Sequence, residues 1–201
     1  MRFRDRAVVA ALLAALGLTP LAADAAKKPP VPKLTAPDLW ATVDVCNTAA
    51  HPDTIGVRGS MPGTGDKHEE MYMRFVIEYQ SGNGHWHYFN TGGISSYIDL
   101  GDASAASRQA GQNFQLGKNV NANYLLRGVI QYEWRLGGRN IGTTVRSTSG
   151  GHQVAAGGDP PGFSAAFCTI QANRRGSLVI TPVTPSPARR AISAASSTVH
   201  T

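Results

Sequence analysis

Two histidines flank a tryptophan in the stretch SGNGHWHYFN, residues 81–90, at a spacing that could serve a metal ion. On an extended strand, side chains two positions apart point to the same face. His85 and His87 would therefore lie together, while Trp86 points the other way. Imidazole nitrogens bind zinc at about 2.0–2.1 Å, but such a site needs a third and usually a fourth ligand. The His-x-His pair alone defines only part of a metal site.

Further ligands for such a site are offered by the loop GTGDKHEE, which precedes the next strand-like segment. Its side chains include His68 and Glu70, which are both common zinc ligands. Nothing in the sequence fixes this loop beside His85 and His87, and acidic loop residues also serve solubility. A metal-binding site, structural or hydrolytic, is therefore the alternative interpretation. We favour a partly exposed aromatic strand edge.

Two carboxylates, Glu78 and Glu133, could act as the acid and base of a glycoside hydrolase if their strands were neighbours. Each glutamate shares its outward row with arginines, however, and cross-strand charge pairs on a wet sheet face explain the pattern equally well. The chain has no Gly-x-Ser-x-Gly nucleophile turn, no His-Glu-x-x-His motif and no phosphate-binding glycine loop. We therefore expect a non-enzymatic protein that needs no cofactor.

The outward row itself is the candidate binding surface, because tyrosine and arginine are favoured at binding faces. The alternative is an ordinary solvated sheet surface, since antiparallel sheets commonly have one polar face. The row consists of Tyr72, Arg74, Glu78, Arg127, Gln131, Glu133 and Arg135.

Strand patterns dominate the middle of the chain. In two stretches an inward, apolar row of side chains alternates with an outward row at period two, which indicates half-buried strands. They are MYMRFVIEY (71–79) and YLLRGVIQYEWRL (124–136). Weaker runs are LWATVDVCN, TIGVRGSM, HWHYFN, ISSYIDL, QAGQNFQL, IGTTVRST and FSAAFCTI, separated by turn residues. RLGGRN (135–140) reads as a hairpin turn, since its glycines tolerate positive φ. About eight short strands without a helical period predict an antiparallel β-sandwich or a barrel. We favour an immunoglobulin- or fibronectin-like sandwich.

The two ends of the chain differ from its middle. Residues 1–26 combine a positive start, an apolar run and an Ala-x-Ala pattern, as in a cleaved signal peptide; an uncleaved anchor is the alternative. Residues 27–38 are rich in Lys and Pro and predict a flexible arm. Residues 174–201 predict a disordered basic tail of Ser, Thr, Pro and Ala. We expect a domain at 39–173 that is secreted or associated with the cell envelope, without a transmembrane segment after signal cleavage.

The excess of basic residues belongs to the ends. The chain carries a net charge of +6, from 19 basic and 13 acidic residues, yet residues 39–173 are close to neutral. Nucleic-acid-binding domains cluster their basic residues on a folded face, so we expect no specific nucleic-acid partner. The partners we expect are anionic polymers of the cell envelope, contacted by the termini, or another envelope protein.

The chain has two cysteines, Cys46 in the first predicted strand and Cys168 in the last. In an exported protein, two such cysteines are expected to form one disulfide bond. Two buried free thiols are the alternative. A redox role is not indicated, because there is no Cys-x-x-Cys motif.

Several stretches resemble a family of small uncharacterised exported proteins of high-GC Gram-positive bacteria. They are LWATVDVCNTAAHPDTIGVRGSMPG, MYMRF, LLRGVIQYEWRLGGR and GGDPPGFSAAFCTI, which together span residues 39–170. The resemblance implies an immunoglobulin-like sandwich with the Cys46–Cys168 pair as a shared element. It implies no activity, cofactor or catalytic residue, and SGNGHWHYFN lies outside the shared pattern.

Overall fold

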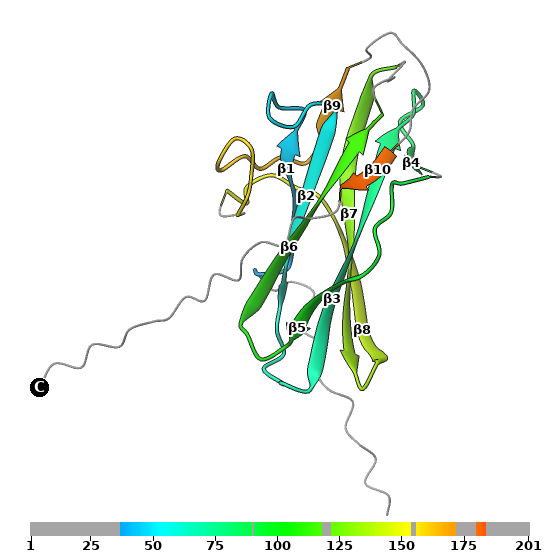
Figure 1. The fold of residues 1–201 in the computed structure, drawn as a ribbon. Coiled ribbons are helices and arrows are strands. Elements are labelled where there is room, and N and C mark those ends of the chain that lie inside the picture. Colours follow the sequence, from blue (N-terminus) through cyan, green and yellow to red (C-terminus); the bar gives the residue numbers. More distant parts are fainter. Residues whose placement is uncertain (1–36, 90, 118–121, 154–155, 172–179, 184–201) are drawn as a thin grey trace, which may run out of the picture.

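The computed structural model describes residues 37–89, 91–117, 122–153, 156–171 and 180–183. The described residues form ten strands and no helix (Figure 1). The strands are β1 (Trp40–Cys46), β2 (Thr54–Pro62), β3 (Glu69–Gln80), β4 (Trp86–Tyr88), β5 (Ile98–Asp102), β6 (Ser107–Leu116), β7 (Tyr124–Leu136), β8 (Arg139–Ser147), β9 (Cys168–Ile170) and β10 (Ile180–Val183). Within this part of the chain, no helix is long and apolar enough to span a membrane.

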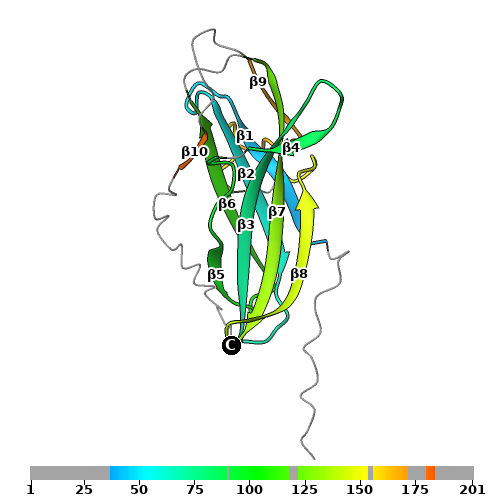
Figure 2. The same ribbon diagram turned by 90° about the vertical axis from the view of Figure 1, so that its right-hand side faces the viewer.

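These strands form two antiparallel sheets. The four-stranded sheet has the order β1-β2-β6-β10, and the six-stranded sheet has the order β4-β3-β7-β8. In the six-stranded sheet, β5 also pairs with β3, and β9 also pairs with β7. Figure 2 shows β3 and β7 running side by side through the middle of this sheet. Two sheets that remain separate make a β-sandwich, as predicted, with ten described strands where the sequence predicted about eight.

The core lies between the two sheets because each contributes one apolar face. Val57 on β2 and Phe114 on β6 meet Phe75 on β3 and Ile130 on β7, and all four side chains are completely buried. Tyr132 on β7 is equally buried, and its hydroxyl donates a hydrogen bond of 2.5 Å to the carbonyl of Trp40 on β1. Period-two alternation along β3 and β7 produces this apolar face, and it leaves the other face of the six-stranded sheet for polar side chains.

The two best-patterned predicted strands are confirmed as β3 and β7. They pair over eleven positions, from Glu69 opposite Leu136 to Tyr79 opposite Leu126. The predicted RLGGRN turn joins β7 to β8, and both of its glycines have positive φ, 56° at Gly137 and 76° at Gly138. A side chain at either position would be strained in this conformation, which is why glycine occupies both.

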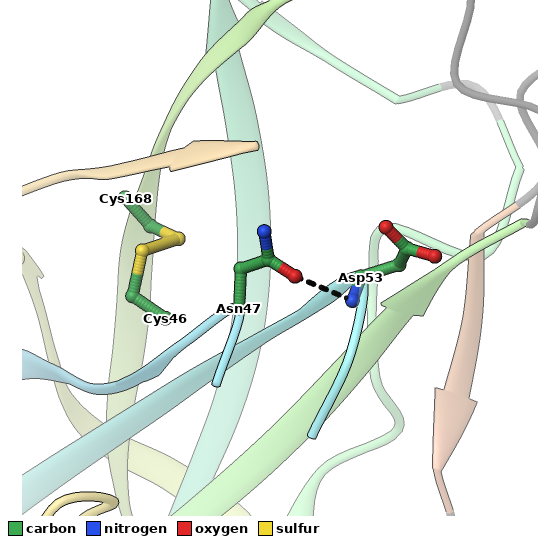
Figure 3. The surroundings of a disulfide bond; sticks show 4 residues. All are labelled: Cys46, Asn47, Asp53 and Cys168. Atoms are coloured by element: carbon green, nitrogen blue, oxygen red, sulfur yellow. Dashed lines mark hydrogen bonds between the residues drawn. A yellow bond between two sulfur atoms is a disulfide. The ribbon is translucent and has the colours of Figure 1, made fainter. Parts of the chain in front are cut away.

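The predicted disulfide joins Cys46 at the end of β1 to Cys168 at the start of β9, across a sequence separation of 122 (Figure 3). Because β1 and β9 belong to different sheets, the bond ties the two layers together at one end. Beside it, Asn47 and Asp53 both have positive φ, and the Asp53 amide donates to the Asn47 side-chain oxygen at 2.8 Å. Asn and Asp are the residues besides glycine that tolerate this conformation best. They therefore close the β1–β2 loop next to the disulfide.

The segment predicted as one strand over FSAAFCTI instead serves both sheets. Ala165 exchanges two backbone hydrogen bonds with Val43 of β1, of 2.9 and 3.0 Å. Three residues later, Cys168 pairs with Leu126 of β7 as the start of β9. The chain therefore crosses from one sheet edge to the other in this segment, which the apolar pattern alone does not reveal.

The predicted strand over ISSYIDL is also shorter in the structure, because β5 begins only at Ile98. Upstream of it, the side-chain hydroxyl of Ser95 accepts a hydrogen bond of 2.9 Å from the Phe75 amide. A side chain therefore takes the place of a backbone carbonyl, and the ladder is interrupted there. Ile94 still makes an isolated bridge to Val76.

The predicted disordered tail at 174–201 contains one described segment, β10, which pairs with β6. Its second residue from the end, Pro182, lacks an amide hydrogen and is tolerated because β10 is an edge strand. The prediction missed this strand because four residues are too few to show a period. The predicted signal peptide at 1–26 and all but residues 37 and 38 of the predicted arm lie outside the described residues.

Candidate interaction face

The outward row predicted from the sequence is gathered on the outer face of the six-stranded sheet. The β3–β7 register sets Glu78 opposite Arg127 and Tyr72 opposite Glu133. It also sets Arg74 opposite Gln131, and Arg135 follows on the same face of β7. All seven predicted residues therefore lie on one surface, and all but Gln131 belong to two clusters of aromatic and charged side chains.

The first cluster, here called the Trp86 cluster, consists of Glu78, Trp86, Tyr88, Arg127 and Phe167. The Arg127 guanidinium donates through Nε and Nη2 to one oxygen of Glu78, each at 2.6 Å. The same guanidinium lies 4.2 Å from the centroid of the Trp86 ring, within cation–π range. The Phe167 ring stacks on Trp86 at 5.7 Å between centroids and 10° between planes.

The second group, here called the Tyr97 cluster, consists of Tyr72, Arg74, Tyr97, Glu133 and Arg135. The Arg135 guanidinium lies 4.1 Å from the Tyr72 ring centroid and 5.0 Å from that of Tyr97. Arg74 approaches the same Tyr97 ring at 5.6 Å. Glu133 accepts a hydrogen bond of 2.9 Å from Arg135 Nε, and the Tyr97 hydroxyl also donates to it.

These contacts fix the charge states of the Tyr97 cluster. The hydrogen bond from Arg135 holds the pKa of Glu133 below its usual value, against the opposing effect of burial. Burial, followed by the hydrogen bond to Glu133, raises the pKa of the Tyr97 hydroxyl. Glu133 is therefore ionised and Tyr97 is neutral at physiological pH. The face carries formal charges that are already matched with one another.

Apolar side chains interrupt this polar surface and are open to solvent. Of the five large hydrophobic side chains that are exposed among the described residues, four belong to the outer face of the six-stranded sheet. Tyr88 and Val145 lie opposite outward residues of β3 and β7, Ile94 bridges Val76, and Phe167 stacks on Trp86. Their exposed fractions are 60% for Tyr88, 48% for Phe167, 47% for Val145 and 41% for Ile94. Such a concentration makes this face the candidate interaction surface.

The sequence prediction omitted the aromatic half of this face. Tyr97 and Phe167 lie in or beside short strands whose alternation is too brief to assign a direction. The side chain of Trp86 was correctly predicted to point away from that of His87, because neighbouring side chains on a strand point to opposite faces. Phe167 could have been found in the same way, because it precedes Cys168, whose sulfur must point inward to reach β1.

The structure does not bring the four proposed metal ligands together. Trp86, between the two histidines, pairs with Gln80 at one end of β3, whereas Glu70 lies ten residues away at the other end. At about 3.4 Å per residue, this is a separation of about 34 Å. His87 instead lies against the Tyr79 ring at 5.5 Å, with its Nε2 3.0 Å from the Ser81 hydroxyl. Across the described residues, no group of three or more His, Cys, Asp or Glu side chains is arranged to hold a metal ion.

The pairing of Glu78 and Glu133 as a hydrolytic acid and base is also excluded by the register. Their strands are neighbours, but Glu133 lies opposite Tyr72, six residues along β3 from Glu78. This is about 20 Å, well beyond the roughly 5–9.5 Å that separates catalytic carboxylates in glycoside hydrolases. Each carboxylate instead binds an arginine. Glu78 binds Arg127 across the strand pair, as predicted, whereas Glu133 binds Arg135 of its own strand.

The four-stranded sheet contains a buried carboxylate, Asp44, which lies at the bulge of β1 and is 2% exposed. Arg58 Nε donates to its Oδ2 at 2.8 Å, while its Oδ1 has no hydrogen-bond partner in the described part of the chain. A Cβ at the neighbouring Gly56 would lie 2.7 Å from this Oδ1, so only glycine fits there. Burial raises the pKa of Asp44, and Arg58 opposes this effect.

The raised pKa of Asp44 predicts a pH-dependent difference between the protein and its Asp44→Asn variant. The folded state binds the Asp44 proton more tightly than the unfolded state does. Wild-type stability relative to the variant should therefore be highest below the unfolded pKa of about 3.9, and it should fall as pH rises through the folded pKa. Urea unfolding of both proteins between about pH 4 and pH 7 measures this difference. A relative stability that rises over this range would mean that Arg58 outweighs burial.

No protein family matches this chain, and no curated protein is significantly similar to it.

Proposed function

We propose that this protein is an exported, non-enzymatic interaction module of the cell envelope, with the outer face of the six-stranded sheet as its binding surface. The observation that carries the proposal is the concentration of exposed Tyr88, Ile94, Val145 and Phe167 among arginine–aromatic contacts. Binding faces are rich in aromatic residues and arginine and poor in lysine. The predicted outward row and the two clusters contain three arginines and no lysine.

Export is supported by the sequence of residues 1–26 and by the disulfide, because disulfides persist mainly in oxidising compartments. The same disulfide fits the resemblance to exported immunoglobulin-like sandwiches of high-GC Gram-positive bacteria. We assign the anchoring of the module to its cationic ends. These ends attract anionic wall polymers over a range of about 8 Å at physiological salt and about 3 Å at 1 M salt.

The binding surface is tested by retention of the chain lacking residues 1–26 on purified envelopes of a high-GC Gram-positive bacterium. Tyr88→Ala combined with Phe167→Ala should lower retention severalfold, because both side chains are exposed on the proposed surface. The matched control combines Gln109→Ala with Gln115→Ala, two exposed outward positions on β6 of the other sheet. Equal retention of all three proteins would refute the proposed surface.

The anchoring role is tested separately by removing charge rather than residues. A deletion from 174 onward would also remove β10 and uncover the edge of β6, so substitution by glutamine is the cleaner change. Retention should become insensitive to salt in this variant, whereas that of the unaltered chain falls at 1 M salt. The substituted residues are Lys27, Lys28, Lys33, Arg174, Arg175, Arg189 and Arg190.

A further inference from the structure

The proposed binding face has an apolar centre between its two clusters. Ile94 bridges Val76, which lies opposite Val129, so three aliphatic side chains form one row across the sheet. Val145 lies opposite Gln131, one outward position further along. Val76 and Val129 are buried, whereas Ile94 and Val145 are exposed. An apolar centre bordered by arginine and aromatic side chains is the composition of a protein–protein interface.

The same features argue against other classes of ligand. The guanidinium groups of Arg127 and Arg135 already bind Glu78 and Glu133, so they are not available to neutralise an anionic polymer. Exposed aliphatic side chains such as Ile94 and Val145 would bury poorly against the hydroxyl groups of a glycan. They complement the apolar surface of another protein.

The balance of charge on this face identifies which protein it fits. Three arginines are interspersed with three glutamates, and two aspartates of β5 lie opposite Tyr72 and Glu70, so the face carries both signs with a small excess of negative charge. A surface that meets a copy of itself must be self-complementary, and a face of one sign would repel its copy. The two main arginine–glutamate pairs are internal, so burial at an interface would leave neither glutamate without a partner. The charged residues are Arg74, Arg127, Arg135, Glu70, Glu78, Glu133, Asp99 and Asp102, the last of which pairs with Arg108 of β6.

The positions of these residues suit a twofold axis. Gln131 lies opposite Arg74 near the middle of the face, and Arg127 and Arg135 each lie four residues from it along β7. At about 3.4 Å per residue, both arginines are about 14 Å from Gln131, in opposite directions. A twofold axis that passes beside Gln131, in the plane between the two sheets and across the strands, therefore sets the Trp86 cluster of one copy against the Tyr97 cluster of the other. This is the reciprocal contact that a symmetric dimer requires.

The size of the face is also sufficient for a stable dimer. β3 and β7 contain 12 and 13 residues, which corresponds to a length of about 40 Å. Four strand positions about 4.8 Å apart give a width of about 19 Å. The product, roughly 800 Å², matches the area of about 800 Å² that each partner buries in a standard interface.

We propose that two copies of this chain form a symmetric dimer by packing the outer faces of their six-stranded sheets against each other. The proposal rests on the proposed function, because it names the partner of the same face. It also links that face to the cationic ends. A dimer carries two sets of them, and simultaneous binding of both sets raises the apparent affinity for an anionic surface without any new contact.

Sedimentation equilibrium of the chain lacking residues 1–26 tests the dimer. We expect a dimer with a dissociation constant of about 10 µM or lower. Val145→Asp, which puts a charge in the apolar centre, should raise this constant at least about tenfold. The control is Gln109→Asp, which is also an exposed outward strand position, on β6 of the other sheet, and should leave the constant unchanged. A chain that stays monomeric at about 100 µM, or a Val145→Asp variant that dimerises normally, overturns the proposal.

Crosslinking at the proposed axis gives a second measurement that does not depend on stability. Residues on a twofold axis meet their own copies, so Gln131→Cys should be joined efficiently by a short bis-maleimide. Facing sheets pack about 10 Å apart, beyond the roughly 7 Å limit for a direct disulfide, so a spacer is needed. Gln109→Cys is the control and should give little crosslinked dimer. Equal crosslinking at both positions would show that contacts are random.

Failure of the dimer and failure of the proposed function are distinguishable. If the chain is monomeric but Tyr88→Ala with Phe167→Ala lowers envelope retention, the face binds a different partner and only the dimer proposal is wrong. If the chain is dimeric but envelope retention is the same for every face variant, the dimer stands and the envelope role of the face is wrong. If the chain is monomeric and retention is unaffected, both proposals are wrong.

Discussion

Replacing both cysteines by alanine is expected to lower the free energy of unfolding by about 4–5 kcal/mol. The Cys46–Cys168 bond closes a loop with a sequence separation of 122, so it removes a large conformational entropy from the unfolded chain. It also joins β1 to β9, whose three residues pair only with the end of β7. Without the bond, β9 is held only by this short ladder, by the burial of Ile170 and by the hydrogen bonds of Ala165 to β1. We therefore expect the segment 163–170 to loosen before the sheets separate.

Urea unfolding of Cys46→Ala/Cys168→Ala and of the unaltered chain measures this effect, at a low protein concentration so that dimerisation does not contribute. Hydrogen exchange at residues 163–170 reports the local loosening. Alkylation of the unfolded, unreduced chain provides the chemical control, because it should label neither cysteine. A stability loss below about 1 kcal/mol would show that the unfolded chain is already compact near this end.

The strands predicted most reliably from the sequence are those that alternate over many residues. β7 was predicted with its observed bounds, and β3 within two residues at each end, because both alternate over nine or more residues and bury one complete face. Their parity also placed all seven outward residues on one face. Pairing the two strands then brought Glu78 to Arg127, which is the part of the interaction face that alternation can determine.

Short segments were predicted poorly because their conformation depends on distant partners. Ala165 belongs to the edge of β1 and Cys168 to the edge of β7, a change of sheet that depends on the two sheets already being packed. Ser95 interrupts its strand through a side-chain hydrogen bond to Phe75. Tyr97 and Phe167 follow these irregular segments, so their contribution to the interaction face depends on tertiary structure rather than on local pattern.

The four proposed metal ligands are not brought together for a related reason. His87 lies on β4 with its ring against Tyr79, and His85 precedes the strand, but the position of the GTGDKHEE loop depends on the direction of β3. A strand of 12 residues separates its two ends by about 40 Å. The loop at its start and the histidines beyond its end are therefore held apart by the strongest element of the fold. Sequence proximity was misleading because the intervening segment is extended.

Substitution of Trp134 by alanine is expected to destabilise the protein by about 3–5 kcal/mol. Trp134 is completely buried on β7, and its indole Nε1 donates a hydrogen bond of 3.2 Å to the carbonyl of Pro62 at the end of β2. The side chain therefore fills the core and also links the two sheets at the end opposite the disulfide. Alanine would leave a cavity and an unpaired buried carbonyl, whereas Trp134→Phe keeps most of the volume and should cost about 1–3 kcal/mol.

These values are measured by urea unfolding followed by circular dichroism, since tryptophan fluorescence would change with the substitution itself. Thr143→Ala, an exposed position of β8 in the same sheet, is the control and should change stability by less than about 0.5 kcal/mol. A variant in which both cysteines and Trp134 are replaced tests whether the two ends of the sandwich contribute to stability independently. Losses that add within about 0.5 kcal/mol would show that the disulfide and the tryptophan stabilise the packed sheets independently. A clearly smaller combined loss would mean that loosening one end has already released the other, so that the two sheets separate as a single cooperative unit.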